Sequence, residues 1–135
     1  MKTGVIGYPR VGELRELKFI TEKYFRKEVS LEELQKTAKE IREKQWKLQK
    51  ENEIDFISSN DFSFYDGVLD TAFLINAVSD EYKNLNLSKI DTYFAAARGY
   101  QGEEGDVKAL SMRKWFNTNY HYMVPVLDDN TILKL

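Results

Sequence analysis

The chain has 135 residues, with 20 lysines and arginines against 22 aspartates and glutamates and a formal net charge of -2. This balance excludes a polyelectrolyte, and a hydrophobic share of 42% is too high for a disordered chain. Without cysteine, disulfides and iron–sulfur clusters are excluded. No apolar run approaches the ~18 residues that a membrane span needs, and no signal peptide is recognisable. We therefore expect a folded cytoplasmic protein with one core and no membrane contact.

The first half of the chain predicts one strand followed by two helices. Residues 4–8 are a short apolar run that must end before Pro9, because proline cannot donate to a strand ladder. Helical spacing begins at Glu13 and predicts the first helix. Ser30 and Glu33 form a capping box, which predicts the start of a second helix. Its buried stripe is expected to comprise Leu31, Leu34, Ala38, Ile41, Gln45 and Leu48.

The second half predicts two further strands separated by helices. Residues 54–59 are β-branched and aromatic and predict the second strand, and the aromatic run 115–126 predicts the third. Helical segments are expected at 63–78, at 91–98 with a stop at Gly99, and around 107–112. Loops are expected at 80–88 and 99–105.

Strands that alternate with helices predict an α/β fold with a parallel sheet. Three strands leave the edges of such a sheet unpaired, whereas complete proteins normally cover their edges. We therefore expect residues 1–135 to be a single partial domain of a larger fold. Self-association through the open edge, at residues 4–6 or 120–124, is also expected.

Two cations in the first turn of the first helix are the leading candidate for a binding site. Arg15 and Lys18 are three residues apart and share a helix face. A helix N-terminus already carries partial positive charge, so cations here are unfavourable unless an anion lies nearby. They predict a carboxylate or phosphate clamp. The alternative is a pair of ordinary solvated charges, offset by Glu13 and Glu16.

Other patterns are weaker. The glycines at 4, 7 and 12 lack the spacing of a phosphate-binding loop. Arg113 and Lys114 precede several aromatic residues, but without a basic stripe we expect no nucleic-acid binding. Asp66 and Asp70 are too few for a metal site, and Asp61 is expected to cap a helix.

His121, the single histidine, lies among apolar neighbours in the third predicted strand. We expect it to be a hydrogen-bonded interior residue rather than a catalytic base or a metal ligand.

Several motifs together, in chain order, resemble the N-terminal part of the cobalamin-independent methionine synthase family. The resemblance covers nearly the whole chain. The motifs are Gly7-Tyr8-Pro9-Arg10-Val11-Gly12, Arg15-Glu16-Leu17-Lys18, Ile54-Asp55, Ser59-Asn60-Asp61-Phe62-Ser63, Tyr65-Asp66, Val68-Leu69-Asp70 and the segment from Lys114 to Pro125.

The resemblance implies that this chain is a fragment, namely the first strands and helices of the N-terminal barrel in an enzyme of two (βα)8 barrels of the TIM type. That family transfers a methyl group from 5-methyltetrahydropteroyltri-L-glutamate to homocysteine to form methionine. Its zinc is held by cysteines and a histidine in the C-terminal barrel, which is absent here. We therefore expect no cofactor in this segment, no catalytic residue, no activity of the chain alone, and homocysteine binding only with the C-terminal barrel. The resemblance carries folate triglutamate binding onto Arg15, Glu16, Leu17, Lys18 and Lys114.

Two alternatives stay open. The chain could be a free-standing small module that binds folate or another polyanion without catalysis, or a folded remnant with neither activity nor ligand. Gly67 stands where histidine is common in the family and Asn117 where aspartate is frequent. Neither residue, nor His121, is given a role.

Overall fold

The computed structural model describes residues 1–129 and 131–134 and forms two compact units, Met1–Phe64 and Tyr65–Leu135. The expected mixture of helix and sheet is confirmed, although all the strands are short. None of the helices in the described part of the chain is both long and apolar enough to cross a membrane.

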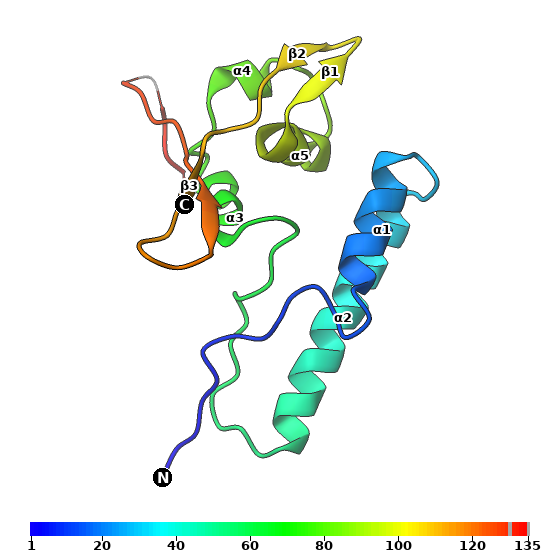
Figure 1. The fold of residues 1–135 in the computed structure, drawn as a ribbon, viewed down its shortest axis with the longest axis vertical. Helices are drawn as coiled ribbons and strands as arrows, with labels where there is room; N and C mark the ends of the chain where they lie inside the picture. The colour runs from blue at the N-terminus through cyan, green and yellow to red at the C-terminus, as the bar shows by residue number, and fades with distance from the viewer. Residues whose placement is uncertain (130, 135) are drawn as a thin grey trace. The chain divides into compact units, whose positions relative to one another are not determined.

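The first unit is built on two helices, α1 (Glu16–Phe25) and α2 (Leu31–Glu51), which pack against each other (Figure 1). Their contact is apolar and buries Leu17 of α1 against Ala38 and Ile41 of α2. Ile20, Phe62 and Phe64 are partly buried against the same cluster. The capping box at Ser30 is present, since its side chain accepts from Glu33 N and the Glu33 carboxylate accepts from Ser30 N.

Two extended segments of the first unit run in parallel, one near residue 4 and one near residue 56. They are joined by a single parallel bridge between Gly4 and Phe56. Phe56 N donates to Thr3 O at 3.1 Å, and the Asp55 carboxylate accepts from Thr3 N at 2.7 Å. These contacts lie where the sequence predicts its first two strands.

In its described residues, 65–129 and 131–134, the second unit combines three helices with two hairpins. The helices are α3 (Gly67–Leu74), α4 (Asp80–Lys83) and α5 (Lys89–Arg98). One hairpin pairs β1 (Tyr100–Gly102) with β2 (Gly105–Val107), and the other pairs β3 (Met112–Lys114) with β4 (His121–Met123). The core is lined by buried residues that include Leu69, Tyr82, Phe94, Ala96 and Met123.

The sheets differ from the prediction. Both ladders are antiparallel hairpins, and the Gly4–Phe56 bridge is the parallel pairing found in residues 1–129 and 131–134. A hairpin closes a short loop, whereas a parallel pair must close a long crossover before it gains any hydrogen bond.

Several predicted elements are corrected. The helix predicted at 63–78 is shorter, because Asp66 caps its start and Asn76 adopts a left-handed φ of 62° after its end. The predicted loop at 99–105 is the β1–β2 hairpin, and the predicted loop at 80–88 contains α4. The helix expected around 107–112 is wrong, since β2 ends at Val107 and β3 begins at Met112. The strand expected over 115–126 is confined to β4.

Candidate functional site

The start of α1 has an unusual backbone. Gly12 has a φ of 84°, and Arg15, at the N-cap position, has a φ of 62° and a ψ of 32°. The left-handed region is uncommon for a residue with a Cβ atom, and such strain persists only where the surrounding structure holds it. Here Arg15 N donates to Gly12 O at 3.3 Å, and Leu17 N donates to Val11 O at 3.0 Å.

The two acids that could have offset the cations of this turn are both engaged elsewhere. Glu13 accepts from Lys44 of α2 at 2.8 Å, and this hydrogen bond lowers the pKa of the Glu13 carboxyl. The Glu16 carboxylate accepts from Leu14 N at 2.9 Å, so it stabilises the turn. Neither acid pairs with Arg15.

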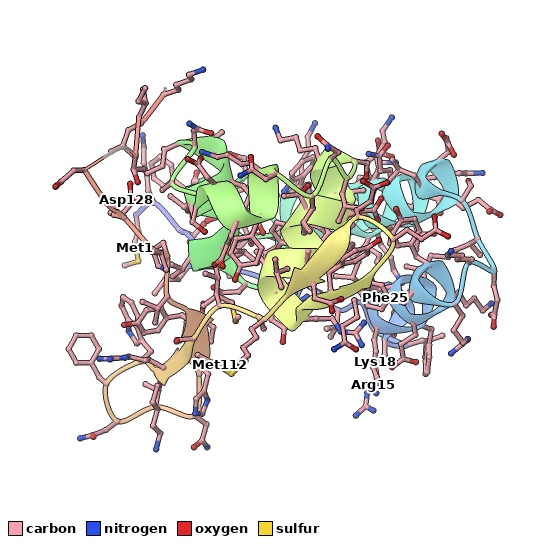
Figure 2. All side chains as sticks on the ribbon, turned by 90° about the horizontal axis from the view of Figure 1, so that it is seen from above. Met1, Arg15, Lys18, Phe25, Met112 and Asp128 are labelled. Atoms are coloured by element: carbon pink, nitrogen blue, oxygen red, sulfur yellow. The ribbon has the colours of Figure 1, made fainter. Side chains whose placement is uncertain are left out.

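The Arg15 side chain is exposed, and within residues 1–129 and 131–134 its guanidinium has no ion pair. Figure 2 shows it extending outward from the start of α1, next to Lys18. The Lys18 ammonium is 3.8 Å from Glu22, and both side chains are about half exposed. A pair of this length in water contributes little, so Lys18 is available to another anion.

Leu17 differs from its neighbours because its side chain belongs to the core and is 1% exposed. Its amide already donates to Val11 O, and its carbonyl accepts from Thr21 Oγ1 at 2.7 Å. Leu17 therefore anchors α1 and fixes the direction in which Arg15 and Lys18 leave the helix.

Lys114 ends β3 in the second unit and is exposed. Among the described residues its ammonium makes no ion pair or hydrogen bond. The residue opposite Lys114 across the hairpin is His121. Arg15 and Lys18 belong to the first unit and Lys114 to the second, and the binding of one folate triglutamate by all three cations stays a prediction.

His121 is exposed, so the expectation of an interior histidine is wrong. Met123, two residues further along β4, is buried, whereas His121 lies at the start of this three-residue strand. Its ring Nδ1 is 3.0 Å from Asn119 O.

A buried polar network in the second unit was missed by the sequence analysis. The Asp66 carboxylate caps α3 by accepting from Leu69 N at 3.1 Å, and it also accepts from Met123 N at 3.0 Å and from the Tyr120 hydroxyl. Asp66 thus ties β4 to the start of α3. The expectation that Asp61 caps a helix is wrong, since Asp61 accepts from Tyr8 N at 2.9 Å in the first unit.

Tyr93 of α5 completes this network. Its hydroxyl accepts from Tyr65 N at 3.0 Å and from Asp66 N at 3.3 Å, and it donates to Asp70 at 2.5 Å. Burial, reinforced by the Asp70 carboxylate, raises the pKa of the Tyr93 phenol, which therefore stays a hydrogen-bond donor. Asp at the position before a helix was the available signal for Asp66, whereas nothing local pointed to Tyr93.

Comparison with known proteins identifies the family. A family model described as "Cobalamin-independent synthase, N-terminal domain" matches residues 2–135. The chain belongs to this family. The recognition made from the Arg15–Lys18 and Lys114–Pro125 motifs is confirmed.

Relatives of this cobalamin-independent synthase domain align with its whole length. The chain is 61% identical to a protein of Campylobacter jejuni subsp. doylei, 60% to one of Streptococcus gordonii and 58% to one of Streptococcus thermophilus, each over 135 residues. All three are named 5-methyltetrahydropteroyltriglutamate–homocysteine methyltransferase. The alignment covers 100% of this chain and 18% of each relative.

The zinc that the family resemblance implies does not fit the residues of this domain. The chain has no cysteine and one histidine, and no group of three histidine, cysteine, aspartate or glutamate side chains that could hold a metal occurs in the described part of the chain. The two carboxylates considered as metal ligands in the sequence, Asp66 and Asp70, accept hydrogen bonds from the Tyr120 and Tyr93 hydroxyls.

Proposed function

We propose that this domain supplies part of the folate polyglutamate site of a longer methyltransferase, which moves a methyl group from 5-methyltetrahydropteroyltri-L-glutamate to homocysteine. The observation that carries the proposal is that Arg15 of the first unit and Lys114 of the second unit are each exposed and each without an ion-pair partner in the described part of the chain. They occur in a chain about 60% identical to relatives named for a triglutamate substrate.

The chemistry of the tail matches these residues. A triglutamate carries several carboxylates, which are ionised at neutral pH. The Arg15 guanidinium offers a planar fork for bidentate pairing, and the ammonium groups of Lys18 and Lys114 act as compact point charges. An exposed pair contributes only about 0 to 1 kcal/mol, so several cations must act together to favour a long tail over a single glutamate.

Glu16 and Leu17, the other two residues of the proposed site, act by holding Arg15 and Lys18 in place. The Glu16 carboxylate binds Leu14 N and shapes the turn before α1, while Leu17 anchors the helix in the core. We therefore propose a positioning role for Glu16 and Leu17, and direct ligand contact for Arg15, Lys18 and Lys114.

We also propose that the domain is the first part of a (βα)8 barrel. The segments around Gly4 and Phe56 run in parallel, and α1 and α2 lie between them in the sequence, which supports this proposal. A barrel strand, a helical excursion and a second parallel strand follow one another in this order. Homocysteine binding and its activation by zinc would then belong to residues outside this chain, and the chain alone would not transfer a methyl group.

The test compares binding of folate triglutamate and folate monoglutamate to the chain by calorimetry. We expect tighter binding of the triglutamate, with about a fivefold loss for Arg15→Ala and for Lys114→Ala, since ~1 kcal/mol is the upper range for an exposed pair. Lys36→Ala removes another exposed lysine, from α2, and is the matched control. Equal affinity for the two ligands, or equal effects of all three substitutions, would refute the proposal.

A further inference from the structure

The β3–β4 hairpin places two basic side chains directly opposite each other. Lys114 and His121 are cross-strand partners. Backbone hydrogen bonds continue this ladder beyond both ends of the paired residues. Trp115 N donates to Tyr120 O, and Val124 N donates to Ser111 O, both at 2.8 Å. Hydrogen-bonded and non-hydrogen-bonded pairs alternate along an antiparallel ladder, so Lys114 and His121 form a non-hydrogen-bonded pair. In such pairs the side chains leave the same face and the Cβ atoms are about 4.5 to 5.5 Å apart.

The hydrogen bond between the His121 ring and Asn119 O shows which ring nitrogen carries the hydrogen. Nδ1 is 3.0 Å from Asn119 O, and a carbonyl oxygen can only accept, so the hydrogen is assigned to Nδ1. Nε2 is then the nitrogen left for a ligand. In the neutral ring Nε2 can only accept, whereas in the imidazolium it donates, and only the imidazolium can bind a carboxylate through this atom.

The charges around His121 favour an anion on this face. Lys114 lies opposite on β3, and Arg113 leaves the other face of the same strand. On the side of α3, the Asp66 carboxylate is occupied by Met123 N and the Tyr120 hydroxyl, and Asp70 accepts from Tyr93. His121 and Lys114 therefore have no carboxylate partner in the described part of the chain.

We propose that His121 binds the ligand carboxylate together with Lys114, and that its imidazole takes up one proton from solvent when it does so. The proposal rests on the proposed polyglutamate site and adds a pH-dependent contact to it. The proton goes to Nε2, which then donates to the carboxylate oxygen, and no covalent bond changes.

Calorimetry of the chain with folate triglutamate at pH 6 and pH 8 tests this inference. Tail carboxylates, lysines and arginines keep their charge across this range, while histidine changes its charge there. We expect about threefold to fivefold tighter binding at pH 6, the ratio given by one exposed charge pair. Repeating the titration at one pH in buffers of different ionisation enthalpy should show net proton uptake.

His121→Gln should remove both the pH dependence and the proton uptake, with the affinity at pH 6 falling to that of the unsubstituted chain at pH 8. Arg113→Gln removes one charge from the opposite face of the hairpin and should leave the pH dependence intact. Far-ultraviolet circular dichroism checks that each variant is folded.

The two proposals fail differently. Binding that weakens in Lys114→Ala but does not depend on pH, or that keeps its pH dependence in His121→Gln, overturns the role of His121 alone. The absence of any triglutamate binding, or binding indifferent to Lys114→Ala at both pH values, overturns the polyglutamate site and this inference with it.

Discussion

Single side chains decide how the second unit holds together. The side chain of Tyr93, on α5, is buried. Its hydroxyl accepts hydrogen bonds from two backbone amides and donates one to a carboxylate. The hydroxyl of Tyr82 likewise donates to Lys108 O at 2.8 Å, and burial raises the pKa of Tyr82 to about 12. Both phenols stay protonated in the folded chain at pH values where phenols of the unfolded chain ionise.

Replacing Tyr93 by phenylalanine tests this assignment. Tyr93→Phe removes three hydrogen bonds, those from Tyr65 N and Asp66 N to the hydroxyl and the one from the hydroxyl to Asp70, so we expect a loss of about 2 kcal/mol in the free energy of unfolding at pH 7. Urea denaturation measures it. Tyr122→Phe is the control, because the Tyr122 hydroxyl has no hydrogen bond among the described residues.

The same variant predicts a dependence on pH. Because the pKa of Tyr93 is raised on folding, its contribution to stability is fully present below about pH 10 and is lost as the unfolded phenol ionises above that value. The difference in unfolding free energy between the unsubstituted chain and Tyr93→Phe should therefore shrink between pH 9 and about pH 11. A difference that stays constant over this range would contradict the raised pKa.

At the scale of the element, α2 shows how much of a buried helix face can be predicted from the spacing of its apolar residues. The predicted stripe is buried at Leu34, Ala38, Ile41 and Gln45. In the last turn the burial moves from Leu48, which is 42% exposed, to Gln49, which is 5% exposed. The returning chain causes this shift, since Ile54 N donates to Gln49 O at 3.1 Å and the Trp46 indole donates to Ser58 O at 3.1 Å.

The capping box of α2 gives a prediction for this element. Ser30→Ala removes the acceptor of Glu33 N and should lower the free energy of unfolding by about 1 kcal/mol. Ser79→Ala is a matched control, because Ser79 occupies the N-cap of α4 without a side-chain capping bond. Thermal or urea denaturation compares the two, and equal effects would argue against the capping role of Ser30.

At the scale of the whole molecule, the two parallel segments of the first unit leave apolar side chains in solvent. Val5, Ile6 and Phe56 flank the single Gly4–Phe56 bridge and are all exposed. An extended segment with few ladder bonds and exposed apolar residues can pair with another chain. This supports the expected self-association at residues 4–6, whereas β4 is already paired with β3 on one edge.

Ile6→Lys tests that expectation. A lysine at a strand edge opposes pairing by charge and by solvation, so this variant should shift the chain toward monomer in light scattering at high concentration. Phe19→Lys changes another exposed apolar residue, on α1 and away from the bridge, and should leave the mass unchanged. A monomeric unsubstituted chain at every concentration would refute self-association.

Local signals in the sequence were enough for the start of α2, for the end of α5 and for the family. Helical hydrogen bonds join residues four apart, so the Ser30 capping box and the stop at Gly99 could be read without knowing the rest of the fold. The ordered motifs, including Arg15–Lys18, identified the family that the comparison confirms. Charge and spacing also singled out Arg15 and Lys18 as candidate anion ligands, and both are exposed in the structure.

The tertiary structure alone decided the strand pairings, the partners of the buried polar groups and the exposure of His121. The hydrogen-bond partners of a strand lie on another segment of the chain. Met112–Lys114 pairs with the nearby His121–Met123 rather than with a distant parallel strand. Asp66 and Tyr93 are 27 residues apart along the chain and meet only because α3 and α5 pack together. Interactions within one helical turn are therefore readable from the sequence, while interactions across the chain depend on which segments the fold brings together.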